Sequence, residues 1–233
     1  MKLRIKFSKS GVMKFIGHLD VMRYFQKAMR RADIDIAYTT GFSPHQIMSF
    51  AAPLGVGLES NGEYFDIEAN SVTSSNDMKE RLNAVMVDGI HVESIRMLPE
   101  NAGNAMASVA AAKYTITFAE GKVPSFDLEE AVNAFMEKET IPVTKQTKKS
   151  ETELDLKPCI YEMSATDKSI MLLVDASSSG NIKPALVLEA LYKEQGYSLP
   201  EFALQITRED TYTNTGTADE PVFLPLLEIG TEF

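Results

Sequence analysis

Apolar and polar residues alternate with a period of two at the start of the chain. In KLRIKF (2–7), Leu3, Ile5 and Phe7 alternate with basic residues, which is the pattern of a β-strand with one buried face. The spacing then becomes helical in HLDVMRYFQKAMRRAD (18–33), where apolar residues recur every three or four positions. The first residues therefore predict a strand followed by an amphipathic helix.

The segments that follow complete one unit, and the same order of elements then occurs again. DIDIAYTT (33–40) predicts a second strand, which IMSFAAPL (47–54) extends or follows. The remaining elements predicted for the first unit are a strand over 63–69, a helix over 74–86 and a strand over 89–99. Those predicted for the second are a strand at 111–120, a helix at 126–139, extended segments at 141–148 and 159–177, a helix at 182–196 and a strand at 202–210.

This order predicts an α+β fold built from two consecutive ferredoxin-like (βαββαβ) units. In each unit a four-stranded antiparallel sheet carries both helices on one face. The expected domains are residues 1–99 and 110–233, joined by the small and polar segment PENAGNAMASVA (99–110).

Charge is distributed unevenly between the two ends of the sequence. The net charge is −10, which at first argues against a nucleic-acid partner. Residues 1–50, however, carry nine Lys and Arg against three Asp and Glu. A basic N-terminal part on an acidic body favours a polyanionic partner for one face, unless the acidic body simply neutralises the basic part.

Other features of the sequence predict a cytoplasmic protein without a cofactor of its own. No apolar run approaches the length of a membrane span, and the N-terminus lacks a signal-peptide core. The single cysteine, Cys159, excludes an internal disulfide and any iron–sulfur or zinc site built from cysteines of this chain. A redox centre would therefore have to come from a partner.

The first predicted helix carries a second stripe, which is basic. Arg23, Lys27, Arg30 and Arg31 are spaced to project away from the apolar face of that helix. Arginine offers a planar fork of donors that matches phosphate oxygens, so the stripe is a candidate nucleic-acid site. The alternative is an ordinary solvated helix face.

The segment GFSPHQ (41–46) follows and adds aromatic groups to the basic stripe. Gly41 permits a turn with positive φ, whereas Phe42 and His45 offer flat faces that can stack on a base, and Tyr38 lies close in sequence. The alternative is that Phe42 packs on the core and His45 only bonds a loop carbonyl. The candidate binding set is Arg23, Lys27, Arg30, Arg31, Tyr38, Phe42 and His45.

Two histidines allow a catalytic alternative. His18 and His45 could act as general base and general acid in metal-independent RNA cleavage if their rings converged. The sequence alone does not show whether they do.

Two neighbouring segments resemble a known family. The first segment runs from His18 to Ser60, HLDVMRYFQKAMRRADIDIAYTTGFSPHQIMSFAAPLGVGLES, and the second is the EYFDIE that follows. The family that they resemble is bacterial, is associated with radical SAM proteins and is described in general terms as a domain of unknown function. TKKSETELDLKPCI, NIKPALVLEALY and LQITRED match as well. The family pattern has Ser where this chain has Gly17, and Asn where it has Ser43. The resemblance implies a radical SAM protein as partner, either fused to the domain or separate.

These observations lead to one main hypothesis and two alternatives. The main hypothesis is a non-catalytic accessory protein, related to RNA or the ribosome, that acts with a radical SAM partner. The alternatives are an endoribonuclease that uses His18 and His45, and a protein-interaction domain that docks a radical SAM module.

Overall fold

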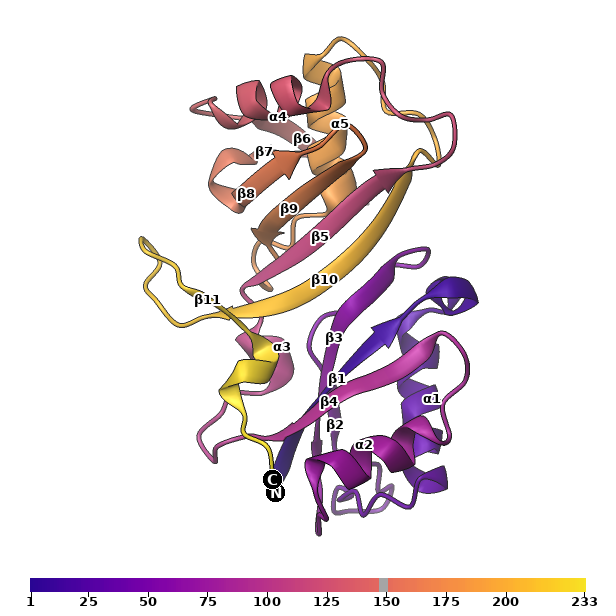
Figure 1. Ribbon diagram of the computed structural model, residues 1–233. Coiled ribbons are helices and arrows are strands. Elements are labelled where there is room, and N and C mark those ends of the chain that lie inside the picture. The colour runs from indigo at the N-terminus through magenta and orange to yellow at the C-terminus, as the bar shows by residue number, and fades with distance from the viewer. Residues whose placement is uncertain (147–150) are drawn as a thin grey trace. The chain divides into compact units, whose positions relative to one another are not determined.

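The computed structural model describes residues 1–146 and 151–233 and shows a mixed α+β chain (Figure 1). The sheet is mostly antiparallel, and the described residues include five α-helices. The predicted α+β class with antiparallel strands is therefore confirmed. No helix in this part of the chain combines the length and apolar character that a membrane crossing needs.

The chain divides into two compact units, one made of residues 1–111 with 208–233 and the other of residues 112–207. The sequence predicted 110–233 as one domain, whereas the last segment of the chain belongs to the first unit. β10 (Leu204–Asn214) contains the division, because its first residues belong to the second unit and the others to the first.

The first unit has the predicted alternation of strands and helices, except for the strand expected over 33–40. Its elements are β1 (Lys2–Lys9), the 3₁₀ helix η1 (Gly11–Phe15), α1 (His18–Arg31), β2 (Met48–Phe50), β3 (Glu59–Glu68), α2 (Ser75–Asn83), β4 (Ile90–Met97), α3 (Ala105–Ser108), the later part of β10, β11 (Phe223–Pro225) and η3 (Leu226–Ile229). In its sheet β1 lies between β4 and β3, and β2 pairs with β3.

Both long helices of this unit pack on the same apolar face of β1. Leu3, Ile5 and Phe7, the alternating residues of the sequence pattern, lie in one core with Phe25 of α1 and Leu82 of α2. Phe7 and Phe25 meet edge to face, with 4.7 Å between their ring centroids. The period-two pattern of the strand and the helical stripe of α1 therefore form the two sides of one core.

The predicted second strand over 33–40 is not found. This segment makes two isolated bridges, Ile36 to Ala69 and Tyr38 to Gln46, and the strand lies later, at β2. The reason is local: the backbone at Asp33 turns through a positive φ of 53°, and Tyr38 then pairs within its own segment instead of extending along the sheet.

The second unit also has a core between helices and strands. Its elements are β5 (Ala111–Phe118), α4 (Leu128–Met136), β6 (Pro142–Gln146), β7 (Glu151–Asp155), η2 (Lys157–Cys159), β8 (Ile160–Ala165), β9 (Ser169–Asp175), α5 (Pro184–Glu194) and the start of β10. β6 and β7 form a separate two-stranded sheet. Residues 147 and 148 of the predicted extended segment lie outside the described residues, and Cys159 is half-buried.

The face of β1 opposite the apolar core of the first unit carries a buried ion pair. Arg4 Nε lies 2.8 Å from Asp66 Oδ1 and Nη2 lies 3.0 Å from Oδ2, and the two side chains are 0% and 3% exposed. The remaining Arg4 nitrogen donates to the carbonyl of Leu226 at 3.1 Å. A bidentate pair in the sheet therefore also holds the C-terminal segment.

Further contacts fix β10 on the first unit. Asp210 accepts hydrogen bonds from Lys6 Nζ at 2.7 Å and from the hydroxyl of Tyr64 at 2.5 Å. Burial and the neighbouring Asp210 carboxylate raise the pKa of Tyr64, which keeps the phenol protonated as a donor. Gly62 is required here, because a Cβ at this position would lie 2.6 Å from Asp210 Cα.

We expect Arg4→Ala to destabilise the protein strongly, because it leaves Asp66 buried without its partner. The expected loss is about 3–5 kcal/mol of the free energy of unfolding. Urea unfolding followed by far-ultraviolet circular dichroism measures it. Lys14→Ala is the control, since its pair with Glu59 is partly exposed and is worth about 1 kcal/mol or less. Equal losses in the two variants would contradict the prediction.

Candidate functional site

The exposed face of α1 carries three of the four predicted cations in one stripe. Arg23, Lys27 and Arg30 are exposed, and Val21 and Phe25 are buried on the other side of the helix. At a rise of about 1.5 Å per residue, the three positions span about 10 Å along the helix axis. We call these three residues the cation stripe.

Arg31 takes a different direction from the cation stripe. Its guanidinium lies over the ring of Tyr24, 5.6 Å from the centroid, and donates to the carbonyl of Val85 at 3.2 Å. Within the stripe, Arg23 pairs with Asp20 at 3.3 Å, but both side chains are about two-thirds exposed. Such a pair contributes little and can exchange for a phosphate.

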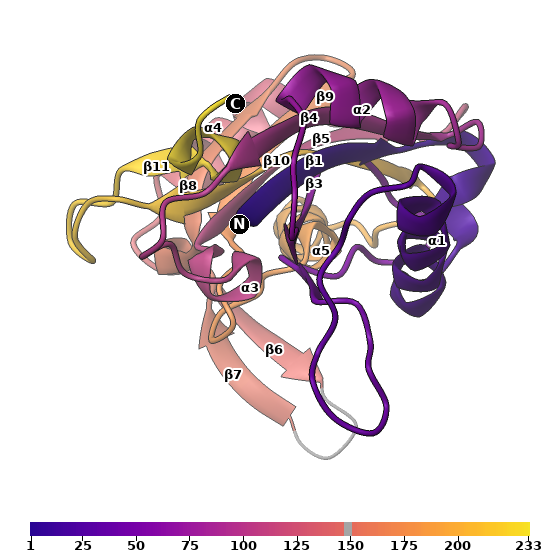
Figure 2. The ribbon, with the colours of Figure 1, turned by 90° about the horizontal axis from the view of Figure 1, so that it is seen from below.

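Residues 37–47 form a hairpin loop; the sequence predicted a loop at GFSPH (41–45) but not the backbone pairing on either side of it. The amide of Ile47 donates to the carbonyl of Ala37, and the amide of Thr39 donates to the carbonyl of His45, both at 2.9 Å. Figure 2 shows this part of the chain, between α1 and β2, reaching away from the sheet of its unit. The loop is therefore a short two-stranded ribbon with an exposed tip.

The tip of the hairpin loop exposes an aromatic ring. Phe42 is fully exposed, at 112% of its reference area, so it does not pack on the core. Gly41 before it has φ of 121°, a backbone conformation that strains any residue with a Cβ. Pro44 on the other side has its φ fixed by its ring. The sequence of the tip therefore directs a large apolar side chain into solvent.

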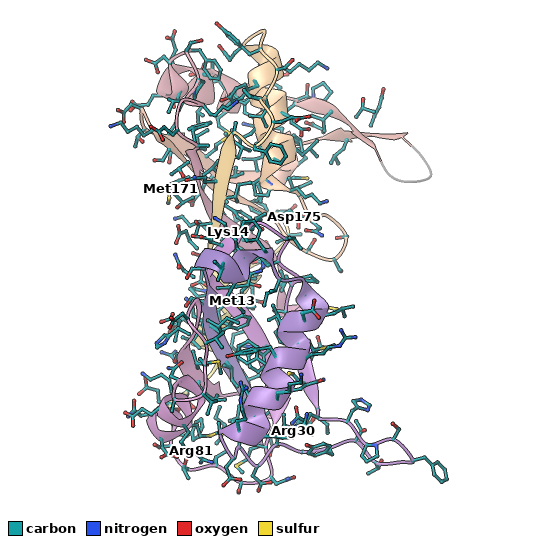
Figure 3. All side chains as sticks on the ribbon, turned by 90° about the vertical axis from the view of Figure 1, so that its right-hand side faces the viewer. Met13, Lys14, Arg30, Arg81, Met171 and Asp175 are labelled. Carbon is teal, nitrogen blue, oxygen red and sulfur yellow. The ribbon has the colours of Figure 1, made fainter. Side chains whose placement is uncertain are left out.

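One glutamine attaches the hairpin loop to α1. The side-chain amide of Gln46 donates to the backbone carbonyl of Gln26 at 3.2 Å and lies 3.4 Å from the hydroxyl of Tyr38. The same carbonyl accepts a hydrogen bond from Arg30 Nε at 3.4 Å. Gln46 therefore connects Tyr38 with the carbonyl that Arg30 also contacts. In Figure 3 the loop extends from the end of α1 where Arg30 is labelled.

His45 lies on the hairpin loop but does not meet His18. Its ring Nδ1 lies 3.1 Å from the hydroxyl of Thr39. The ring of His18, at the other end of α1, packs edge to face on Phe50 at 5.3 Å. Gln26, where the hairpin loop attaches, lies eight positions after His18, which is about 12 Å along the helix. The two rings thus have separate surroundings.

His18 instead borders a buried charged cluster. Lys9, His18 and Glu63 line a cavity of about 10 Å³ together with apolar residues, which is about the size of one water molecule. Lys9 Nζ donates to the carbonyl of Ile16 at 3.3 Å, and Glu63 accepts from Arg208 at 2.9 Å. Burial lowers the pKa of Lys9 and of His18, and in both cases the nearby carboxylate of Glu63 opposes this effect.

The sequence analysis did not single out Lys9, Glu63 or Arg208. A signal for Glu63 was present, because it stands two and four residues before Phe65 and Ile67 in a strand whose apolar residues face the core. Lys9 follows Phe7 by two residues, so the period-two pattern places it on the same face, but it lies beyond the segment 2–7 from which the strand was predicted. In the described residues, no group of three or more metal-ligating side chains is placed to hold a metal ion.

The chain belongs to a family described as an uncharacterised protein conserved in bacteria (DUF2344), whose model matches residues 2–184. No curated protein matches the sequence. Among solved structures, a chain of a Cbf5–Nop10–Gar1 complex is similar, with a TM-score of 0.49 and 8% identity. The match covers 90% of this chain and 48% of that one, so the chain spans about half the length of the structure it matches.

We expect Gln46→Ala to loosen the hairpin loop from α1, because both hydrogen bonds of the amide are lost. At about 0.5–1.5 kcal/mol per bond, the two bonds together correspond to an acceleration of amide exchange in residues 37–47 of roughly five- to 150-fold. Hydrogen exchange with mass spectrometry measures this. Gln205→Ala, an exposed glutamine of the second unit, is the control. Unchanged exchange in the loop would show that Gln46 does not hold it.

We expect the free energy of unfolding to decrease as the pH is lowered through the range where His18 titrates. Burial lowers the pKa of His18 from its usual value of 6.5, so below that pH the unfolded chain binds the proton more readily than the folded one. The contribution of the neutral ring is present above about pH 6.5 and is lost as the pH falls. Urea midpoints at about pH 8 and about pH 5.5 should differ more for the natural protein than for His18→Gln. Equal differences would refute this assignment.

Proposed function

We propose that this member of the DUF2344 family is an RNA-interacting accessory protein that binds through the cation stripe and the hairpin loop. In this proposal the chain is not itself an enzyme and carries no redox centre. It works in the cytoplasm with a radical SAM protein, the partner that its sequence resemblance suggests. RNA or a ribosomal component would be the molecule that it presents.

One observation carries the RNA part of the proposal. A fully exposed Phe42 stands on a loop whose base meets Arg30 at the Gln26 carbonyl. Cations attract phosphates without regard to sequence, whereas an exposed ring offers a face for a base. The combination supports a nucleic-acid ligand better than either feature alone.

The charge of the whole chain does not oppose this proposal. At a net charge of −10 the protein repels polyanions at long range, but salt screens this repulsion beyond about 8–10 Å. At the stripe itself three cations face solvent, and Asp20 is the acidic residue paired within it. Local charge therefore decides contact with a phosphate backbone.

We further propose that both units are ferredoxin-like, although one contains an inserted hairpin. The support is the strand order, β4, β1, β3 and β2 in the first unit and β10, β5, β9 and β8 in the second. In this proposal β6 and β7 are the insertion.

Binding of a fluorescein-labelled random RNA of about 20 nucleotides, followed by anisotropy at salt from about 50 to 200 mM, tests the RNA role. Replacing Arg23, Lys27 and Arg30 together by Ala should weaken binding and reduce the salt slope by about two, because about 0.7 is lost per phosphate contact on a single strand. The control replaces three exposed lysines of the second unit, Lys122, Lys168 and Lys183, by Ala.

The controls separate the three hypotheses. Both triple variants change the net charge equally. Equal weakening of RNA binding in the two variants would therefore indicate a long-range effect of charge and refute the assignment of binding to the cation stripe. RNA recovered and sized after the titration should be intact, and shortened RNA would favour the nuclease that uses His18 and His45. Absence of RNA binding at about 150 mM salt would leave the third hypothesis, in which the surface docks a protein.

A further inference from the structure

We infer that the hairpin loop and the cation stripe bind single-stranded RNA, with one unpaired base stacked on Phe42. This inference rests on the proposed function and names its class of substrate. A duplex with the same sequence would bind through its phosphates alone.

The exposure of Phe42 favours an unpaired base. In a duplex each base is already stacked between its neighbours, so an aromatic side chain finds a free base face only at the helix ends. Single strands, loops and bulges present unstacked bases. Because Phe42 is fully exposed, its ring faces are open to such a base.

The shape of the hairpin loop excludes the usual way of reading a duplex. The major groove of an RNA helix is deep and narrow, and the minor groove is wide and shallow. The ring stands at the tip of a ribbon held by the Tyr38–Gln46 bridge, so it would have to enter a groove end-on. A splayed base on a flexible strand can instead meet the ring in solution.

The cation stripe has the length of a short strand segment. Arg23, Lys27 and Arg30 cover about 10 Å along α1, and the phosphates of one strand of duplex DNA repeat about every 3.4 Å along the helix axis. An unstacked single strand is more extended, so the stripe spans at most about three nucleotides. Gln46 links the end of the stripe to the hairpin loop through the carbonyl that Arg30 also contacts.

The hairpin loop is ordered before any ligand binds. The hydroxyl of Thr39 accepts from the amide of His45 and contacts its ring, both at 3.1 Å. Pro44 restricts the tip through its fixed φ, and Tyr38, about half exposed, offers a second aromatic face near the base of the loop. A loop fixed in this way loses less conformational entropy on binding.

The experiment compares one fluorescein-labelled RNA of about 12 nucleotides, single-stranded or annealed to its complement, at about 150 mM salt. We expect the single strand to bind at least tenfold more tightly. Phe42→Ala should weaken single-strand binding by roughly tenfold, within the range for one base stacked on an aromatic ring. It should leave duplex binding unchanged.

Two matched variants isolate stacking. Phe42→Leu retains an apolar side chain without a flat ring, so it should behave like Phe42→Ala. Val12→Ala removes another exposed apolar group, 77% exposed on η1, and should have no effect. Since Phe42 touches no core residue, circular dichroism should show all three variants folded.

The outcomes distinguish this inference from the function on which it rests. Equal binding of both RNA forms, or a Phe42→Ala variant that binds the single strand normally, would overturn the single-strand assignment and leave RNA binding in place. If neither the single strand nor the duplex binds, the single-strand assignment and the RNA function are both overturned, and a protein becomes the expected occupant of the surface.

Discussion

The buried pair of Arg4 and Asp66 is the interaction on which the first unit depends. Each partner would be costly to bury alone, but the bidentate geometry satisfies the carboxylate and leaves one guanidinium nitrogen for the Leu226 carbonyl. The pair therefore joins the first strand of the chain to its last segment. On the opposite face of β1, Leu3, Ile5 and Phe7 hold α1. The position of α1, and with it the cation stripe, follows from both faces of a single strand.

The candidate surface combines a helix packed in the core with an exposed aromatic ring on a loop. The stripe lies on a helix whose other side is packed in the core, and the hairpin loop is attached to that helix by Gln46. The buried cluster of Lys9, His18 and Glu63 lies beneath the N-terminus of α1. His18 faces this cluster whereas His45 contacts Thr39, so the two histidines have separate surroundings.

The sequence predicted those features that depend on local periodicity. The strand of Leu3, Ile5 and Phe7 and the helix beginning at His18 were correct, since apolar spacing reports directly on the buried face. The loop at GFSPH was predicted, but the pairing that flanks it was missed, because Tyr38 pairs with Gln46 through the backbone and such pairing leaves no pattern in the side chains. The contribution of Arg208 and Asp210 to the first unit was also missed, because a contact across about 150 residues has no local signal.

The return of the last segment to the first unit has a consequence for biosynthesis. Lys6, Glu63 and Arg4 find partners in residues 208–226, which leave the ribosome after the whole second unit. At about 5–20 residues per second, the hundred or so intervening residues take roughly 5–20 s to translate. During this interval Lys6 and Glu63 of the nascent first unit lack the charged groups that pair with them in the folded protein. The whole second unit is made before these partners, so it is complete before the first unit although it comes later in the chain.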